Sequence, residues 1–422
     1  MIRIHLLVGA MLMSLLGSAG YAQTIAIINA RVISMGPEGD IRDGTVLVAD
    51  GMIVALGEHV ALPSGVRIID AKGQFLTPGL ILAPTPLALK DIIGNGGGRQ
   101  STDRLTAAYE VADDFNPRHP HVREARAEGV TLALVAPDAQ RSGRLFAGQA
   151  ALVQLGSSGE AVINARAAIY VSATESGSIE AGGGSGGLRV RLTRALDDAR
   201  DYRRDPSHYD LARLEDLGLS RSDLVALGSV VEGKEPLLVE VNRAEEIRHI
   251  LMFAKTQRIR VILSGASEGW LVADDIAKAG VPVVIDGEIN QAESFDQLNA
   301  SYENAALLTK AGVRVAFKPT FSRIEILDRS PRWSAGRAAR FGLRLHDALA
   351  AITINPAQMF GLADRYGSIE IGKKANLVIW SGDPLETTTT ARMVMIDGVE
   401  QSLTTRASML RDRYLPSIMS AP

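Results

Sequence analysis

The chain has 422 residues, of which 46% are hydrophobic, 22% charged and 5% aromatic, a profile typical of a globular protein rather than a disordered or fibrous one. It contains 45 Lys and Arg residues against 48 Asp and Glu residues, a formal net charge of -3. The excess positive charge of a nucleic-acid-binding protein is missing, so we expect no nucleic-acid partner. There is no cysteine, which excludes disulfides, thiolate nucleophiles, cysteine-ligated zinc and iron–sulfur clusters.

Residues 1–22 have the pattern of an export signal. Arg3 precedes an apolar run at 6–16, and small residues at Gly20 and Ala22 fit cleavage by a signal peptidase. The apolar run is shorter than the roughly 20 residues of a membrane-spanning helix, so we expect no stable membrane anchor. The sequence therefore predicts cleavage near Ala22 and a periplasmic or secreted mature protein.

Short β-type runs separated by glycine-rich turns occur near both ends of the chain. They lie at 25–33, 45–49 and 52–56, and again at 367–380 and 392–398. Two separate caps are one interpretation, but each set alone is too small to bury a core. We therefore expect residues 23–77 and 365–404 to form one composite β-sandwich, followed by a C-terminal tail at 405–422.

The middle of the chain, 78–364, follows a strand-then-helix rhythm. Helical patterns at 243–257, 268–279, 294–311 and from about 332 alternate with apolar runs. Seven candidate strands lie at 79–83, 130–136, 167–171, 237–242, 260–265, 281–286 and 313–318. This alternation predicts an α/β fold with a parallel sheet, most economically a (β/α)8 barrel of the TIM type. The eighth strand is expected between 188 and 234, where a helical pattern dominates; an open doubly wound sheet is the alternative.

In such a barrel, functional groups lie at the C-terminal ends of the strands. Charged side chains that could act in catalysis lie at three of these ends, at Glu240, Asp286 and Lys318. We take these three as the candidate catalytic residues lining the barrel mouth. Their neighbours at the strand ends include Asn242 and Glu288.

Both ends of the chain resemble the amidohydrolase superfamily, in its imidazolonepropionase-like branch. The resemblance rests on these segments: 28–33 (INARVI), 43–48 (DGTVLV), 51–57 (GMIVALG), 76–81 (LTPGLI), 351–357 (AITINPA), 367–373 (GSIEIGK), 375–380 (ANLVIW) and 382–386 (GDPLE). It implies a barrel hydrolase in which one or two divalent cations, such as zinc, activate water against amide, lactam or related non-peptide C–N bonds.

The metal ligands that the resemblance implies are absent at the ends of four strands. The family's His-x-His at the end of the first strand falls on Pro84 and Pro86, whose side chains cannot bind a metal. The expected fifth-strand histidine falls on Glu240, the sixth-strand histidine on Gly265 and the eighth-strand aspartate on Thr320. A lone carboxylate at Glu240 makes at best a weak cation site, so we expect no bound metal or other cofactor.

Two other motifs are compatible with ligand chemistry but have simpler interpretations. His119 and His121 form a second His-x-His, which lies in a proline-rich loop before a helix rather than at the end of a barrel strand. The glycine-rich stretch 182–187 has nucleotide-loop spacing, but no strand runs directly into it, which favours a flexible loop.

Two functions from different classes therefore stay open. The first is an exported hydrolase that cleaves C–N bonds by an unrecognised route, with Glu240 or Asp286 as general base. The second is a pseudoenzyme whose barrel mouth binds a small-molecule ligand or a partner without turnover. Lys318 lies two positions before Thr320, on the same face of its strand, so its ammonium is predicted to reach Glu240 in place of a metal. The alternative is that Lys318 turns outward to solvent.

Overall fold

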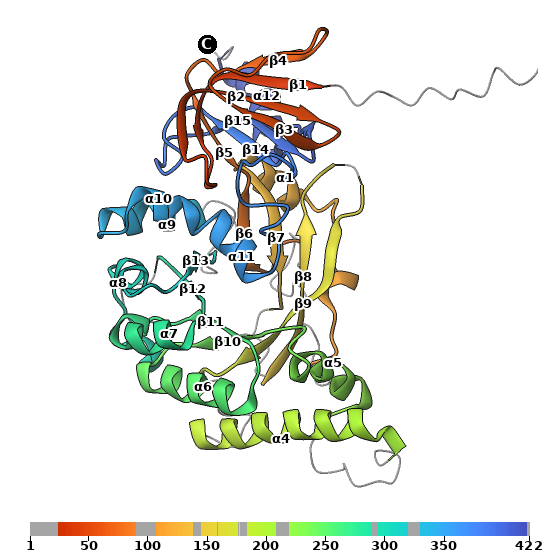
Figure 1. Cartoon of the computed structure of the whole chain (residues 1–422), viewed down its shortest axis with the longest axis vertical. Helices are drawn as coiled ribbons and strands as arrows, with labels where there is room; N and C mark the ends of the chain where they lie inside the picture. Colours follow the sequence, from red (N-terminus) through yellow and green to blue (C-terminus); the bar gives the residue numbers. More distant parts are fainter. Residues whose placement is uncertain are drawn as a thin grey trace, which may run out of the picture.

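The structure is a computed structural model that describes residues 24–89, 107–137, 145–157, 159–175, 177, 184–207, 219–288, 292, 294–319 and 330–419. Two eight-stranded sheets organise it. In Figure 1 the sheet built from the two ends of the chain lies at the top, and the second sheet extends below it beside a stack of helices. The expected export signal at 1–22 and the glycines at 182 and 183 lie outside the described residues.

The first sheet joins both ends of the chain. Its strands are β1 (Ile25–Ile33), β2 (Asp40–Ala49), β3 (Met52–Gly57), β4 (Arg67–Asp70), β5 (Phe75–Pro78), β14 (Leu377–Trp380), β15 (Ala391–Ile396) and β16 (Val399–Glu400). β14 pairs antiparallel with β5, and one apolar core is shared by strands from both ends. The prediction that the ends meet is therefore confirmed, with one continuous hydrogen-bonded sheet where a two-sheet sandwich was expected. The residue limits of the two domains stay predictions.

The second sheet is a nearly closed barrel. Its strands are β6 (Leu80–Thr85), β7 (Val130–Val135), β8 (Phe146–Gln154), β9 (Val162–Ser172), β10 (Leu237–Val241), β11 (Val261–Gly265), β12 (Val283–Ile285) and β13 (Val315–Phe317), hydrogen-bonded in that order. β13 also packs against β6, which brings the two edges together. The barrel interpretation is confirmed over the open doubly wound sheet.

The position of the eighth strand corrects the sequence analysis. The strand that was expected between 188 and 234 is β8, upstream of that region, while the described parts of 188–234 carry two helices and no strand. β8 pairs antiparallel with both β7 and β9, so the sheet is not all parallel. Only seven residues, 155–161, connect β8 to β9, too few for the crossover of a dozen or more residues that a parallel connection needs.

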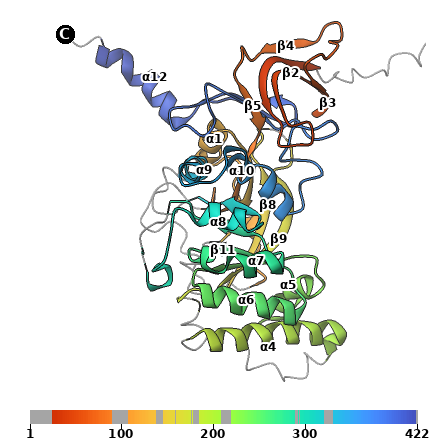
Figure 2. The same ribbon diagram turned by 60° about the vertical axis from the view of Figure 1, so that its left-hand side comes forward.

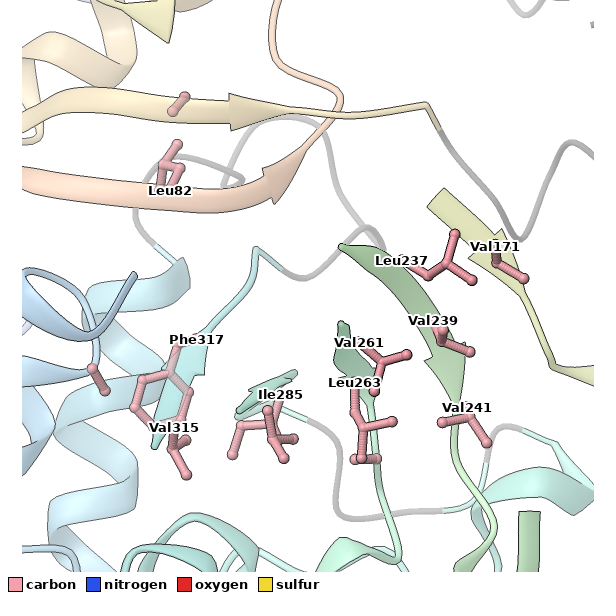
Figure 3. Packing of buried hydrophobic residues seen from close by; sticks show 14 of the residues in the cluster. Leu82, Val171, Leu237, Val239, Val241, Val261, Leu263, Ile285, Val315 and Phe317 are labelled. Carbon is pink, nitrogen blue, oxygen red and sulfur yellow. The ribbon is translucent and has the colours of Figure 1, made fainter. Parts of the chain in front are cut away.

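Helices cover the outside of the barrel, and apolar side chains fill the space beneath them. The helices around the barrel are α1 (Pro120–Ala127), α4 (Ser185–Arg204), α5 (Arg221–Val231), α6 (Ala244–Gln257), α7 (Ala273–Ala279), α8 (Asn304–Lys310), α9 (Ser330–Arg340), α10 (Leu345–Ala350) and α11 (Ile354–Met359). Figure 3 shows outward-facing residues of this core, among them Val239, Leu263 and Phe317. The alternate residues point into the barrel, where Leu238, Ile262 and others form a second cluster, as the two-residue period of a strand requires.

The chain ends in α12 (Arg406–Met419), which extends away from the body in Figure 2. Its first backbone N–H, from Arg406, donates to the Glu124 carboxylate of α1 at 2.9 Å. Within the described residues, no helix is long and apolar enough to cross a membrane.

Candidate functional site

The candidate site lies inside the barrel, toward the C-terminal ends of β9, β10, β11 and β13. β10 reads LLVEV, with Leu237, Val239 and Val241 facing the helices, so Leu238 and Glu240 face inward. Glu240 is directly opposite Ser264 in the parallel pairing of β10 with β11. Lys318 follows β13 directly and is buried with them. Parallel pairing thus brings together side chains that are far apart in the sequence.

An ion pair occupies the centre of the site. The Lys318 ammonium donates to Glu240 Oε1 at 2.7 Å, and the two side chains are 4% and 1% exposed. The predicted contact between Lys318 and Glu240 is therefore present, and the outward-turned alternative is wrong. The second carboxylate oxygen, Oε2, accepts hydrogen bonds from Tyr170 Oη at 2.7 Å and Ser264 Oγ at 2.5 Å. Lys318 Nζ also lies 3.4 Å from Ser264 Oγ.

These contacts set the protonation of Glu240. Burial by itself raises the pKa of a carboxyl group, but the Lys318 charge and the hydrogen bonds from Lys318, Ser264 and Tyr170 outweigh it and hold the pKa of Glu240 below its usual value. The carboxylate is therefore ionised at neutral pH, with both oxygens engaged. A general base needs a pKa near the working pH, and the lowered pKa of Glu240 in this arrangement does not meet that requirement.

Gly265 has a backbone conformation that only glycine adopts easily. Its φ is +84°, and a Cβ at this position would lie 2.5 Å from Asn242 Oδ1 and 3.0 Å from Glu240 Oε1. Asn242 Oδ1 already accepts from Ser267 Oγ at 3.0 Å. A histidine at position 265, where the family resemblance expects a metal ligand, would meet both backbone strain and steric conflict here.

Asp286, the third candidate, belongs to a different set of contacts. It follows β12 and its Oδ1 accepts from the backbone N–H of Glu288 at 2.9 Å. The Glu288 carboxylate forms an ion pair with Arg337 at 2.7 Å. Lys318 thus makes its ion pair with Glu240 and not with Asp286, so the structure unites two of the three candidate residues.

Sequence reasoning missed Tyr170 and Ser264, the two hydroxyl donors. Ser264 is a single polar residue within the otherwise apolar strand β11, and Tyr170 faces inward from β9. A lone polar residue on the inward face of a barrel strand is a signal that could have identified Ser264. Tyr170 carries no such signal, because a tyrosine in a strand is usually packing.

The residues present do not fit the divalent cation that the fold family implies. Pro84 and Pro86 are buried at the end of β6 and beyond it, and the position of Thr320 lies outside the described residues. Among the described residues there is no group of three or more His, Asp or Glu side chains that could hold a metal ion. The one carboxylate on the inner face of β10 already holds an ammonium at 2.7 Å. A second cation beside this ammonium would be repelled.

The second His-x-His lies at the start of a helix. The His119 ring is buried, and its Nδ1 accepts from the backbone N–H of His121 at the N-terminus of α1. The two rings meet edge to face with centroids 4.9 Å apart. Burial first, and then the neighbouring His119, lower the pKa of His121. His119 therefore caps α1 and His121 lies in its first turn, in agreement with the simpler interpretation of this motif.

Known proteins share this architecture. The profile described as "Amidohydrolase family" matches residues 282–400. An imidazolonepropionase from Sphingopyxis alaskensis is 24% identical over 85% of this chain and 92% of its own length. The amidohydrolase tasK from Hapsidospora irregularis is 21% identical over 85% of this chain, which spans 40% of that protein.

A solved structure supports the same relationship. The amidohydrolase from Thermotoga maritima MSB8 superposes with a TM-score of 0.78 at 26% identity, over 90% of this chain and 99% of that one. The terminal sheet, the barrel and the sequence matches at both ends agree, and the chain belongs to the amidohydrolase superfamily of hydrolases, in its imidazolonepropionase-like branch.

Proposed function

We propose that this protein is an exported amidohydrolase-superfamily member that has lost metal-dependent hydrolysis and acts as a pseudoenzyme, its barrel mouth binding a small molecule or partner without turnover. The observation that carries the proposal is the buried contact of 2.7 Å between Lys318 Nζ and Glu240 Oε1. A lysine attached to the barrel supplies a positive charge at the fifth-strand position to which the family resemblance assigns a metal ligand.

The chemistry of water activation supports this proposal. The pKa of bulk water lies far above neutral pH, whereas zinc lowers the pKa of a bound water molecule to near 7 in hydrolytic sites. An ammonium has no empty orbital for a water oxygen, so Lys318 cannot act as a Lewis acid. Glu240 does not replace the metal as a base. Burial raises its pKa, but the Lys318 charge and three hydrogen bonds outweigh burial and hold the pKa low.

Metal content and turnover of the mature protein test the proposal together. Protein dialysed against metal-free buffer is analysed by plasma mass spectrometry, then assayed on amides, lactams and an imidazolone with and without added zinc or manganese. We expect well under 0.1 equivalent of transition metal and no hydrolysis above the buffer rate. About one equivalent of zinc, manganese or iron that survives dialysis would contradict the proposal and favour an active hydrolase with an unrecognised ligand set.

Export is a separate part of the proposal and rests on the pattern of residues 1–22. We expect the mature protein in the periplasmic or secreted fraction, with an N-terminus at Gln23. Deletion of residues 2–22 is expected to leave the protein in the cytoplasm. Normal export of the deletion variant would contradict this part and leave the proposal for the barrel mouth untouched.

A further inference from the structure

A large cavity opens at the end of the barrel opposite to Glu240. Its volume is about 1030 Å³, and its walls include the residues that immediately precede β10, β11, β12 and β13, namely Pro236, Arg260, Pro282 and Arg314. The last turns of α6 and α7 and the end of α11 complete it. Inward-facing Leu238 and Ile262 lie between this cavity, which we call the basal pocket, and the ion pair.

Positive charge is concentrated around the basal pocket, although the chain as a whole carries a formal charge of -3. Five exposed basic side chains line it and form no ion pair within the described structure: Lys255, Arg258, Arg260, Lys278 and Arg314. The one acidic residue in the lining is Asp275, whose carboxylate is held by Arg248 at 2.9 Å. The pocket therefore presents an uncompensated cluster of cations, which raises the local concentration of anions.

Helix ends account for only part of this charge. Lys255 and Lys278 lie in the last turns of α6 and α7, where a cation complements the carbonyl end of the helix dipole. Arg260 and Arg314 precede strands, and Arg258 follows α6 with a left-handed φ of +55°. Arg258 is the C-cap residue of α6 and shares this role in part, but Arg260 and Arg314 have no helix-stabilising role of this kind, and all three arginines line the same pocket.

The walls of the basal pocket are apolar as well as basic. Leu251, Ile259 and Met359 are buried beside it, and Met252 is 60% exposed. A hollow of this volume matches the size of pockets that enclose small molecules, whereas a membrane surface is attracted to a flat or convex basic face. Arginines suit the geometry of phosphate and carboxylate groups, to which they donate in pairs.

We propose that the basal pocket binds a small soluble molecule that carries at least two phosphate or carboxylate groups next to an apolar part. The anionic groups contact Arg258, Arg260 and Arg314, and the apolar part covers Met252. This site is separate from the barrel mouth, so it neither requires nor excludes the loss of metal chemistry proposed there.

The test uses the mature protein and trinitrophenyl-ATP, a fluorescent probe that combines a triphosphate with aromatic rings. The test variant is Arg258→Gln, Arg260→Gln and Arg314→Gln together. The matched control removes the same charge from exposed arginines in the terminal sheet and in α12, away from the pocket: Arg42→Gln, Arg392→Gln and Arg413→Gln. A third variant with lysine at 258, 260 and 314 keeps the charge.

We expect saturable probe binding by the unmodified protein that weakens as salt is raised. The glutamine variant should bind at least tenfold more weakly, while the control variant stays within about threefold of the unmodified protein. The lysine variant, which keeps the charge but not the paired donors, should bind with intermediate affinity. Equal weakening in the control variant would show a general charge effect and overturn the proposal. Absence of saturable binding, or preferential binding to phosphatidylglycerol vesicles over the soluble probe, would also overturn it.

Discussion

Replacing Lys318 by methionine is the most direct test of the ion pair. Methionine keeps most of the length and the apolar contacts of the lysine side chain but removes its charge. Glu240 then stays buried at 1% side-chain exposure, and the Tyr170 and Ser264 hydroxyls are the donors that remain to it among the residues that the structure describes. Removing one partner of a buried ion pair costs about 3–5 kcal/mol of folding stability, because the other charge is left uncompensated.

The geometry of the pair supports a loss of this size. Two unit charges at the observed 2.7 Å attract by about 6 kcal/mol at an effective dielectric constant near 20. Most of that attraction is offset in the intact protein by the loss of hydration of both groups. The double variant Glu240→Gln with Lys318→Met removes both charges and keeps an oxygen that accepts from Tyr170 and Ser264. Its stability is therefore expected to lie within about 1–2 kcal/mol of the unmodified protein.

The pH dependence of folding stability adds a direction to the same prediction. In the unmodified protein the pKa of Glu240 lies below its unfolded value, because the Lys318 charge and the hydrogen bonds overcome burial. The stabilisation is therefore present above the unfolded pKa and is lost as the pH falls through the folded pKa. Without Lys318, burial dominates and raises the pKa of Glu240. The folded single variant then binds more protons than its unfolded chain, so its stability falls as the pH rises.

Urea denaturation of the mature protein at pH 5 and pH 8, followed by tryptophan fluorescence, measures these differences. The single variant is expected to lose more stability at pH 8 than at pH 5, and the double variant to recover most of the loss at pH 8. If Lys318→Met costs less than about 1 kcal/mol at both pH values, Lys318 does not neutralise Glu240 in the folded protein. The reasoning would also be refuted if the stability lost by the double variant equalled the sum of the losses caused by Lys318→Met and Glu240→Gln separately.

Three further changes test other parts of the structure. Gly265→Ala should destabilise the fold by about 1–3 kcal/mol in urea denaturation, because the φ of +84° and the close oxygens leave no room for a Cβ; unchanged stability would contradict this geometry. Trp380→Phe removes the donor to Thr77 Oγ1 at 2.8 Å in a buried site and should lower the melting temperature, by an amount corresponding to about 1–2 kcal/mol. Glu400→Ala should change stability by less than about 1 kcal/mol, since Arg67 and Glu400 are 42% and 43% exposed; a larger loss would mean that this contact is essential to the joining of the chain ends.

The ion pair could be predicted from the sequence because strand geometry is regular. In the β10 run LLVEV, the period of two residues separates Leu238 and Glu240 from the three apolar residues that face the helices. The same period puts Lys318 on the inward face after β13. Parallel strands end at the same edge of the barrel, so charged residues at those ends meet even though 78 positions separate them.

The eighth strand and the hydroxyl donors could not be found in the same way. β8 is joined to β7 by ten residues, 136–145, and to β9 by seven, 155–161, both shorter than the crossover of a parallel connection, so a search for strand–helix alternation passes over it. Tyr170 and Ser264 meet at Glu240 only because β9, β10 and β11 are neighbours in a particular register. A single sequence contains the inward or outward direction of each side chain but not the register between strands, which the assembled sheet determines.

The proposed loss of the metal and the observed ion pair are physically linked. A buried carboxylate at the fifth-strand position needs a positive charge nearby, because an isolated buried charge is strongly unfavourable. A divalent cation needs several ligands at once, and the side chains of the prolines at 84 and 86 and the glycine at 265 supply none. A single lysine is enough to neutralise Glu240, and Tyr170 and Ser264 donate the other hydrogen bonds to its carboxylate. If Lys318 replaces the metal, as proposed, introducing histidines at positions 84, 86 and 265 alone leaves the Lys318 ammonium at Glu240. Metal binding is then expected only in a variant from which Lys318 is also removed.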